Sequence, residues 1–396
     1  MNFLLNEEQR LLQDSVRRFV ERDYTFESRQ KSLSSGGHSA EVWKVIVDQG
    51  WLGAGLKEDV GGFGGGAIES CIVAHELGRG LVREPYLAVA VLLARTILSA
   101  AQDSKCIEIL GSLVADECNM VLAHHENGQY ENPARVLTRA TSKGGGYVLD
   151  GAKHAILGAS NARRILISAR TSDDDESKEG ISLFDVDVHQ PGIQLRKYRL
   201  IDGTPVSDVY LSGAIVERSA MVGVEGASSA ALADAHDYAV IALCAQAVGA
   251  MEKAIEITTE YLRTRKQFGV PIGTFQALQH RLADMVVALE QSRTMVFRAL
   301  AHLDAEPRSR RVAVASAKVQ MGKSARIIGA QAIQLHGGIG VAEECKIGHY
   351  FKFLHVAEGL FGGTEAHLKT VAHYLRRGTN IPEDKQDDLK IQQSAV

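Results

Sequence analysis

The sequence is poor in cysteine, and its few cysteines are scattered. They are Cys71, Cys106, Cys118, Cys244 and Cys345, and no CxxC pair or Cys/His cluster occurs among them. An odd, dispersed set argues against a disulfide framework, and the missing clusters argue against a structural zinc site. We therefore expect no metal centre and a reducing cytoplasm as the place of action.

Long apolar runs and blocks of positive charge are also missing. The apolar stretches are short or interrupted by polar residues, which predicts no membrane span. The N-terminal stretch, MNFLLNEEQRLLQDSV, is acidic and amphipathic and lacks the basic start and apolar block of a signal peptide. The formal net charge is −4 without a basic stripe, so nucleic acid is not an expected partner.

The remaining composition is that of an ordinary globular protein. Of the 396 residues, 45% are hydrophobic and 23% are charged, which is close to the average for soluble domains. A chain of this length is long enough for roughly two or three domains.

Residues 1–117 are expected to form an all-α domain, because Leu4, Leu5, Leu11, Leu12 and Val16 recur at helical spacing. A glycine-rich connection follows, GWLGAGLKEDVGGFGGGAIES. It lacks a GxGxxG pattern and a Walker lysine, so we interpret it as a packed loop between helices.

The periodicity changes at Cys118. Short runs rich in Val, Ile, Leu and Tyr follow, such as RRILISAR and SDVYLSGAIV, and glycine-rich or charged turns separate them. This pattern is typical of an antiparallel β domain, which we place at residues 118–223. The charged segment TSDDDESKEG is interpreted as an exposed hairpin tip.

Helical periodicity returns at about residue 224 and persists. Long apolar-periodic segments such as AVIALCAQAVGAMEKAIEITTEYLRTR and HRLADMVVALEQSRTMVFRALAHL predict a four-helix bundle over residues 224–380. Residues 381–396 form a polar tail. The predicted fold class is therefore α+β.

Two glycine pairs near the end of the bundle, Gly337-Gly338 and Gly362-Gly363, have two interpretations. Glycine is common just past the end of a helix. Glycine also lets the backbone approach a ligand closely, so two such pairs fit a large cofactor gripped at two points.

The domain order and three motifs resemble the acyl-CoA dehydrogenase family. Residues 261–285, YLRTRKQFGVPIGTFQALQHRLADM, are similar to the family's Arg-x-x-Phe-Gly turn with its Phe-Gln and Ala-Asp-Met helix. Residues 334–340 match its Gln-x-x-Gly-Gly-x-Gly, and the loop from Gly50 with the helix end HELGRG is the third motif. The similarity extends to about residue 378 and implies a helical domain, a middle β domain and a C-terminal four-helix bundle.

The resemblance implies an FAD site shared between subunits. One group of residues would hold the diphosphate and adenosine of the FAD seated in a neighbouring subunit, and Thr364 and Glu365 would lie along the FAD of the same subunit. An arginine suits the diphosphate because it donates several charge-assisted hydrogen bonds in one plane; the alternative for Arg265 is a surface ion pair with a nearby acid. The first group comprises Arg265, Gln267, Phe268, Gln276, Gln334, Leu335, Gly337 and Gly338.

The family's reaction is the α,β-dehydrogenation of an acyl-CoA thioester. A carboxylate removes the α-proton, the β-hydrogen leaves as hydride to the flavin, and the electrons pass to an electron-transfer flavoprotein. A backbone N–H and a flavin hydroxyl hold the thioester carbonyl and stabilise the developing enolate.

The usual base is absent here. The family's Glu stands directly before a Gly-Thr pair, and this position is Gly362. Some members carry the base on the long bundle helix, at the position of Ala239, where the neighbouring arginine is replaced by Val240. The catalytic base is therefore unknown. Glu358 and Asp237 are the candidate carboxylates. The alternatives are ordinary roles, as a solvated surface acid for Glu358 and as a helix-capping or ion-paired acid for Asp237.

The β domain departs from the family as well. The family's Thr-Glu-Pro-Gly-Ala-Gly-Ser-Asp falls on residues 125–132, where only Glu126 and Gly128 match. The Trp-Ile-Thr that backs the flavin ring falls on residues 155–157, and Leu157 lacks the hydroxyl that would meet flavin N5. His336 and His125 are tempting bases, but we interpret both as packing or hydrogen-bonding residues.

This combination resembles the small subunit of bacterial pimeloyl-CoA dehydrogenase-type heteromers. We hypothesise an FAD-binding subunit of an α2β2 assembly whose own site is weak or silent and whose homologous large subunit brings the base. Two alternatives stay open. One is a self-sufficient homotetrameric acyl-CoA dehydrogenase with a displaced carboxylate, and the other is a non-catalytic structural subunit.

Overall fold

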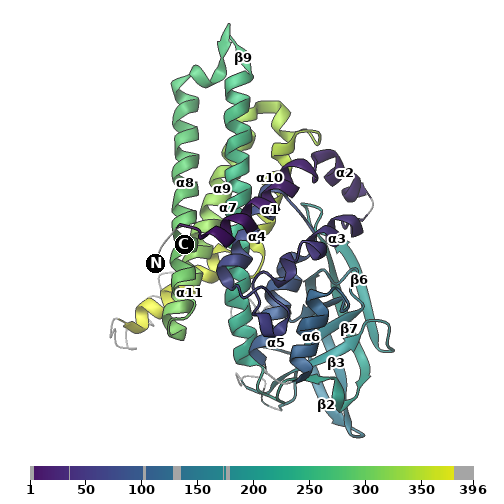
Figure 1. Cartoon of the computed structure of the whole chain (residues 1–396). Coiled ribbons are helices and arrows are strands. Elements are labelled where there is room, and N and C mark those ends of the chain that lie inside the picture. Colours follow the sequence, from purple (N-terminus) through teal and green to yellow (C-terminus); the bar gives the residue numbers. More distant parts are fainter. Residues whose placement is uncertain are drawn as a thin grey trace, which may run out of the picture.

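The computed structural model describes residues 4–34, 36–100, 104–127, 135–172, 174 and 179–378. The predicted tail at 381–396 and part of the predicted hairpin tip lie outside these ranges. Figure 1 shows a bundle of long helices beside a sheet and the shorter helices of the N-terminal third. The three regions follow in the predicted order, and the fold class is α+β. The domain boundaries stay predictions.

Short helices build the N-terminal region. The first begins at a capping box, in which the Asn6 side chain accepts a hydrogen bond from Gln9 N at 2.8 Å and the Gln9 side chain accepts one from Asn6 N at 3.0 Å. The helices are α1 (Glu7–Arg22), α2 (Phe26–Ser34), α3 (Ala40–Asp48), α4 (Ala67–Gly80), a π-helical segment (Leu87–Leu93), α5 (Ala94–Ala100) and α6 (Ser104–Val114).

The middle region is one sheet with the strand order β6-β7-β3-β2-β4-β5-β8, and β1 pairs with β4. The pairings are antiparallel, as predicted, except that β4 runs parallel to β1 and, at one residue pair, to β2. Apolar alternation along a strand carries no information on the direction of its neighbour. The strands are β1 (Met120–Ala123), β2 (Arg139–Lys143), β3 (Gly146–Leu157), β4 (Arg164–Arg170), β5 (Ile181–Asp187), β6 (Ile193–Arg199), β7 (Pro205–Val216) and β8 (Met221–Val222).

The C-terminal region is built on three long helices, and two shorter ones pack on the third. A short hairpin caps the link between the first two and projects beyond the bundle (Figure 1). The elements are α7 (Ser229–Thr264), β9 (Lys266–Gln267), β10 (Val270–Pro271), α8 (Gln276–Ala301), α9 (Pro307–His336), α10 (Lys346–Gly359) and α11 (Thr364–Gly378).

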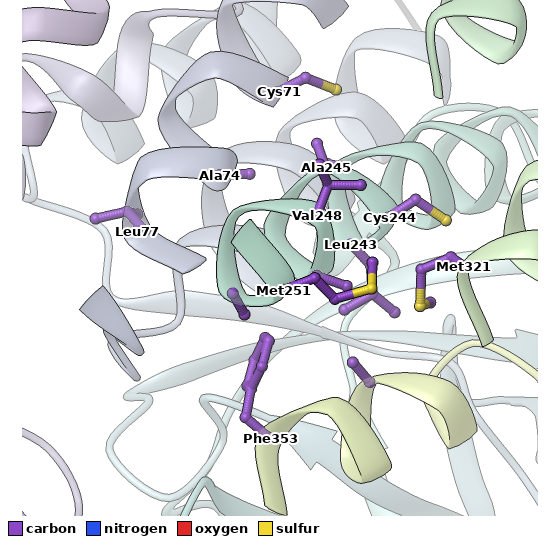
Figure 2. Close-up of a cluster of buried hydrophobic side chains, with 14 of the residues drawn as sticks. Cys71, Ala74, Leu77, Leu243, Cys244, Ala245, Val248, Met251, Met321 and Phe353 are labelled. Atoms are coloured by element: carbon purple, nitrogen blue, oxygen red, sulfur yellow. The ribbon is translucent and has the colours of Figure 1, made fainter. Parts of the chain in front are cut away.

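The helical core lies where α4, α7, α9 and α10 meet (Figure 2). Close approach of α4 and α7 depends on two glycines. A Cβ on Gly78 would lie 2.0 Å from Gln246 O, and a Cβ on Gly249 would lie 2.0 Å from His75 O. Larger side chains at either position would force the two helices apart, which is why the HELGRG motif and the small-residue face of α7 belong together.

The remaining expectations concern membranes and metals. Across the described ranges, no helix combines the length and the apolar character that a membrane crossing requires. Within the same residues, no group of three or more His, Cys, Asp or Glu side chains is arranged to hold a metal ion.

Candidate active site

The turn that joins α10 to α11, residues 360–363, stands where the resemblance places the catalytic carboxylate; we call it the base turn. Phe361 and Gly362 both adopt left-handed backbone conformations, with φ of 56° and 93°. The carbonyl of Phe361 accepts a hydrogen bond from His367 Nε2 at 2.9 Å. This bond ties the turn to the first helical turn of α11.

Gly362 is buried, and a side chain at this position would be crowded and strained. A Cβ built on it would lie 3.1 Å from His367 Nε2. A non-glycine residue would also be strained at this positive φ. The imidazole of His367 therefore lies directly against the point where a side chain at position 362 would begin, and the base turn itself carries no carboxylate.

The second family position for the base, Ala239 on α7, is buried and apolar, as is Val240 beside it. His236 lies one helical turn before Ala239. Its ring is stacked on that of His367, with centroids 6.3 Å apart and planes 16° apart, and meets the ring of Phe361 edge-on at 6.1 Å. Two histidines thus fill the space between the two positions from which a base would act.

Both histidines are held neutral. Burial is the main cause that lowers the pKa of His236 well below its ordinary value, and the nearby Arg311, His367 and His124 lower it further. Burial likewise lowers the pKa of His367, to about 4, although the Phe361 carbonyl opposes the shift. Two neutral imidazole rings can stack in parallel because no charge repulsion separates them.

Glu358, the first candidate carboxylate, caps α11. Its Oε1 accepts a hydrogen bond from Thr364 N at 3.0 Å. Burial raises the pKa of Glu358, but the hydrogen bonds from Thr364 and the charges of Lys318 and Arg326 outweigh it, so the pKa is lowered overall. A carboxylate held ionised by a helix N-terminus is a weaker base than a free one.

Asp237, the second candidate, faces away from the base turn. Its carboxylate pairs with Arg310 Nε at 3.3 Å and Arg311 Nη1 at 2.9 Å, both on α9. Burial raises its pKa, and the two arginines oppose the rise. Adjacent helical positions such as His236 and Asp237 point about 100° apart, so the geometry gives Asp237 a structural role between helices.

Of the two remaining histidine candidates, His336 has both a hydrogen bond and a packing contact. His336 Nδ1 bonds to Ala332 O at 2.8 Å, and its ring stacks on Tyr261 with centroids 4.4 Å apart. Burial lowers the pKa of His125, and His154 and Lys153 add to the effect. The contacts of His336 agree with the interpretation from the sequence, and the interpretation of His125 stays a prediction.

The residues expected to hold the ADP part of FAD gather at the far end of the bundle. The stack of Tyr261 on His336 joins the end of α7 to the end of α9 and thereby brings the two motifs together. We call the resulting surface the ADP surface. It comprises Arg265, Gln267, Phe268, Gln276, Gln334, Gly337 and Gly338, all of which are exposed.

The ADP surface fits the group that it is expected to bind. Phe268 is 91% exposed and touches Phe275 edge-on, which leaves a face open for a base to stack upon. Nothing lies within 4 Å of a Cβ built on Gly337 or Gly338, so the backbone is open to close approach. Arg265 forms no ion pair with a described acid, contrary to its alternative interpretation.

Three of the expected FAD contacts are not part of the ADP surface, and for Thr364 and Glu365 the expected contact with the FAD of the same subunit stays a prediction. Leu335 is in the core, so only its backbone faces outward. The hydroxyl of Thr364 lies against Gly322 on α9, where a Cβ would come within 2.2 Å of it. Glu365 is exposed and lies 4.0 Å from Lys369. Both Thr364 and Glu365 stand at the start of α11, apart from the ADP surface.

The β domain also carries residues that differ from the family pattern. Glu126 is buried and pairs with the buried Lys153 at 2.7 Å. Part of the stretch matched to residues 125–132, from residue 128 onward, lies outside the described ranges. Leu157 helps to line a cavity that also touches the N-terminal helices and α10.

Sequence reasoning missed His236 and His367. Each lies close in the sequence to a position that the family resemblance singles out, because His236 precedes Ala239 by three residues and His367 follows Thr364 by three. Their positions in the chain are 131 residues apart, however, and only the fold brings their rings together.

Comparison with known proteins identifies the family. Three domain profiles match: acyl-CoA dehydrogenase N-terminal domain over residues 6–117, middle domain over 122–214 and C-terminal domain over 232–375. A relative, the probable acyl-CoA dehydrogenase YdiO of Escherichia coli (strain K12), is 28% identical over 393 residues, covering 98% of this chain and all of YdiO.

Solved structures agree over the whole fold. The ChsE4-ChsE5 complex from Mycobacterium tuberculosis matches with a TM-score of 0.84 and 26% identity, over 96% of this chain and 100% of the other. The FAD complex of PigA matches with a TM-score of 0.86 and 26% identity, over 95% and 99% of the two chains. The chain therefore belongs to the acyl-CoA dehydrogenase family of FAD-dependent oxidoreductases.

Proposed function

We propose that this chain is a subunit of a hetero-oligomeric enzyme that dehydrogenates an acyl-CoA thioester between Cα and Cβ and passes the electrons to an electron-transfer flavoprotein. The observation that carries the proposal is a contrast within one bundle. The ADP surface is exposed and open, whereas the base turn has no carboxylate, and a side chain at Gly362 would meet a positive φ and a tight contact with His367.

In the proposed assembly, Arg265, Gln267 and Phe268 hold the ADP end of the FAD that a homologous large subunit carries. Arg265 donates to the diphosphate, and Phe268 offers a ring face to the adenine. Bound FAD supplies the acceptor for the β-hydrogen. The large subunit supplies the carboxylate that this chain lacks.

The base turn retains one group that suits a thioester. Gly362 is a buried residue, and its N–H donates no hydrogen bond to the described residues. Buried backbone N–H groups without a partner are rare. An N–H at this place can hold the thioester oxygen and stabilise the enolate that forms as the α-proton leaves.

A hetero-oligomer is supported by the likeness to the ChsE4-ChsE5 complex, which pairs two different chains. The resemblance to the small subunit of pimeloyl-CoA dehydrogenase-type heteromers points the same way. We place the assembly in the cytoplasm, where the five free thiols would stay reduced.

Purification from the native source tests the assembly. We expect a yellow protein with flavin absorbance and a near-stoichiometric second chain that has a glutamate before its Gly-Thr pair. A colourless protein would instead favour a structural subunit. A yellow protein that purifies as a single chain would favour the homotetramer.

One observation favours the self-sufficient alternative. The ring of His236 stands between the two family positions for the base, and its Nδ1 is buried without a hydrogen-bond partner among the described residues. A neutral imidazole can accept a proton at such a nitrogen. If the chain turns over substrate alone, His236→Gln should abolish that turnover.

A further inference from the structure

Lys318, near the middle of α9, is a lysine without access to solvent. Its relative exposure is 0%, and no described carboxylate forms a salt bridge with it. Lysine is almost never fully buried unless it is paired, because desolvation of the ammonium group is costly. The burial of this cation therefore indicates a role that its hydrogen bonds should reveal.

The hydrogen-bond partners of Lys318 are carbonyls at the end of α10. Its Nζ donates to Ala357 O at 2.6 Å and to Glu358 O at 2.8 Å. The last four carbonyls of a helix have no partner within that helix, and short N···O distances are typical of charge-assisted hydrogen bonds. Lys318 thus fixes the last turn of α10 from a neighbouring helix, directly before the base turn.

The same face of α9 also contacts the residue that follows the base turn. Gly322 comes four residues after Lys318 and so lies on the same side of the helix. A Cβ on Gly322 would lie 2.2 Å from the Thr364 hydroxyl oxygen and 3.1 Å from Glu358 Cγ. One face of α9 therefore holds the chain on both sides of the base turn.

Further hydrogen bonds extend this fixation to the turn itself. The Glu358 carboxylate accepts from Thr364 N at 3.0 Å, and Phe361 O accepts from His367 Nε2 at 2.9 Å. Gly362 lies within the loop that the first of these bonds closes, and its N–H has no acceptor among the described residues. The direction of this N–H therefore depends on where Lys318 holds the backbone of Glu358.

The charge of Lys318 also bears on the chemistry at Gly362. The C-terminal end of a helix carries a partial negative charge of about half an elementary charge, and α10 ends directly before the base turn. That partial charge opposes an enolate oxygen held at the Gly362 N–H. A cation bound to the terminal carbonyls offsets it.

The charge of Lys318 changes close to neutral pH, whereas the charges of its neighbours do not. Burial lowers the pKa of Lys318 to about 8, although Cys244 on α7 and Glu358 on α10 oppose the shift. Burial raises the pKa of Cys244 to about 12 and lowers that of His367 on α11 to about 4. Burial also raises the pKa of Glu358, but the hydrogen bonds from Thr364 outweigh it, so this pKa is lowered. Between pH 7 and pH 9, Lys318 therefore loses its proton while these three groups keep their charge states.

We propose that Lys318 is a positioning residue for thioester binding: its ammonium group ties the end of α10 so that the N–H of Gly362 is directed at the thioester oxygen. The inference rests on the proposed function, because it takes an acyl-CoA thioester as the ligand of the base turn. It adds a residue whose task is to aim a hydrogen-bond donor at the substrate. A lysine that only caps α10 would stabilise the fold without affecting this donor, and the two roles differ in their effect on ligand binding.

Matched CoA compounds measure what the thioester oxygen contributes to binding. The FAD-loaded full-length chain is titrated with butanoyl-, octanoyl- and dodecanoyl-CoA and with the corresponding S-alkyl-CoA thioethers, which lack the carbonyl oxygen. At pH 7 we expect at least one thioester to bind about 2- to 10-fold more tightly than its thioether, the range that one hydrogen bond contributes. Equal affinity within every pair would overturn the inference.

A pair of variants assigns this preference to Lys318. Lys318→Met removes the ammonium group and keeps a similar side-chain volume, so the core stays filled. We expect the preference for the thioester to disappear, while the affinity for the thioether stays within about twofold. Lys323→Met, at an exposed position of the same helix, is the control and should keep the full preference.

Two results with the variant would contradict the inference. One is a folded Lys318→Met protein, verified by circular dichroism and flavin content, that retains the preference. The other is an equal loss of affinity for thioester and thioether, which is what a merely structural cap predicts. If the chain binds no CoA compound but its native assembly turns over acyl-CoA, the inference fails and the proposed function stands. If the assembly does not turn over acyl-CoA either, the proposed function fails as well.

A pH series on the unmodified chain tests the same point without a variant. Deprotonation removes the charge assistance from the hydrogen bonds of Lys318, so the preference for the thioester should shrink between pH 7 and pH 9. The same decrease is expected in Lys323→Met, and Lys318→Met should show no preference at any pH in this range. A preference in the unmodified chain that stays constant from pH 7 to pH 9 would overturn the inference.

Discussion

The two ends of α7 serve the proposed chemistry in different ways. Near its start, His236 packs against the base turn, where the family's carboxylate has no counterpart. Past its end, Arg265 and Phe268 present an open surface that matches the family motif. The two places are about 44 Å apart along the helix, at 1.5 Å per residue. A subunit can therefore lose the proton acceptor at one end and still serve a cofactor at the other.

Of the substitutions predicted here, Arg265→Ala should have the largest effect. It should change FAD affinity and leave the base turn unaffected. Losing charge-assisted hydrogen bonds to the diphosphate should weaken FAD binding by about 10- to 100-fold. Equilibrium dialysis or flavin fluorescence measures the change in the assembled enzyme.

The control for this change is Arg263→Ala, on the last turn of the same helix and also exposed. It should leave FAD affinity within about twofold, since a surface charge at a distance is largely screened. Equal losses in both variants would mean that general positive charge, and not the Arg265 contact, holds the cofactor.

Gly362→Glu tests the other side of the comparison, the base turn. The new residue meets a positive φ and the His367 ring 3.1 Å from its Cβ. We expect a loss of about 1–3 kcal/mol in the free energy of unfolding and no turnover by the chain alone. Urea denaturation and an acyl-CoA assay measure the two effects.

Gly359→Ala provides the comparison on the same segment. Nothing lies within 4 Å of its Cβ, so stability should change by no more than about 0.5 kcal/mol. A Gly362→Glu protein that is stable and gains robust turnover would show that the turn accepts a base after all.

Glu358→Gln should have the smallest effect and should depend on pH. The folded-state pKa of Glu358 is lowered. Its stabilising contribution is therefore present above the unfolded pKa, about 4.3, and is lost as pH falls through the folded value. Because the side chain is mostly solvent-screened, we expect less than about 1 kcal/mol at pH 7.

The measurement is the difference in urea midpoint between wild type and Glu358→Gln at pH 7 and at pH 3. The difference should shrink at the lower pH. A difference that is constant with pH would mean that the carboxylate charge has no part in capping α11. A large loss of turnover without a loss of stability would make Glu358 a catalytic residue.

The sequence carried the order of the three regions and the ADP surface, because both depend on local patterns. The turn after α7 is read from RKQFG, and the open glycines after α9 are read from HGGIG. The parallel pairing of β4 was not predictable, since alternation does not encode strand direction. The role of Glu358 was not predictable either. It depends on the path of the chain from α10 to α11, which places the Glu358 carboxylate within hydrogen-bonding distance of Thr364 N.

The histidine pair was out of reach for the same reason. The rings of His236 and His367 lie together only because α7 and α11 converge on the base turn.

Turnover by the full-length chain alone, loaded with FAD, tests the central claim most directly. The chain is assayed with medium-chain and dicarboxylic CoA esters, first by itself and then with the second chain from its native assembly. We expect little or no turnover alone and full turnover when the partner is added. Robust turnover by the chain alone would contradict the claim that this chain lacks a working base of its own.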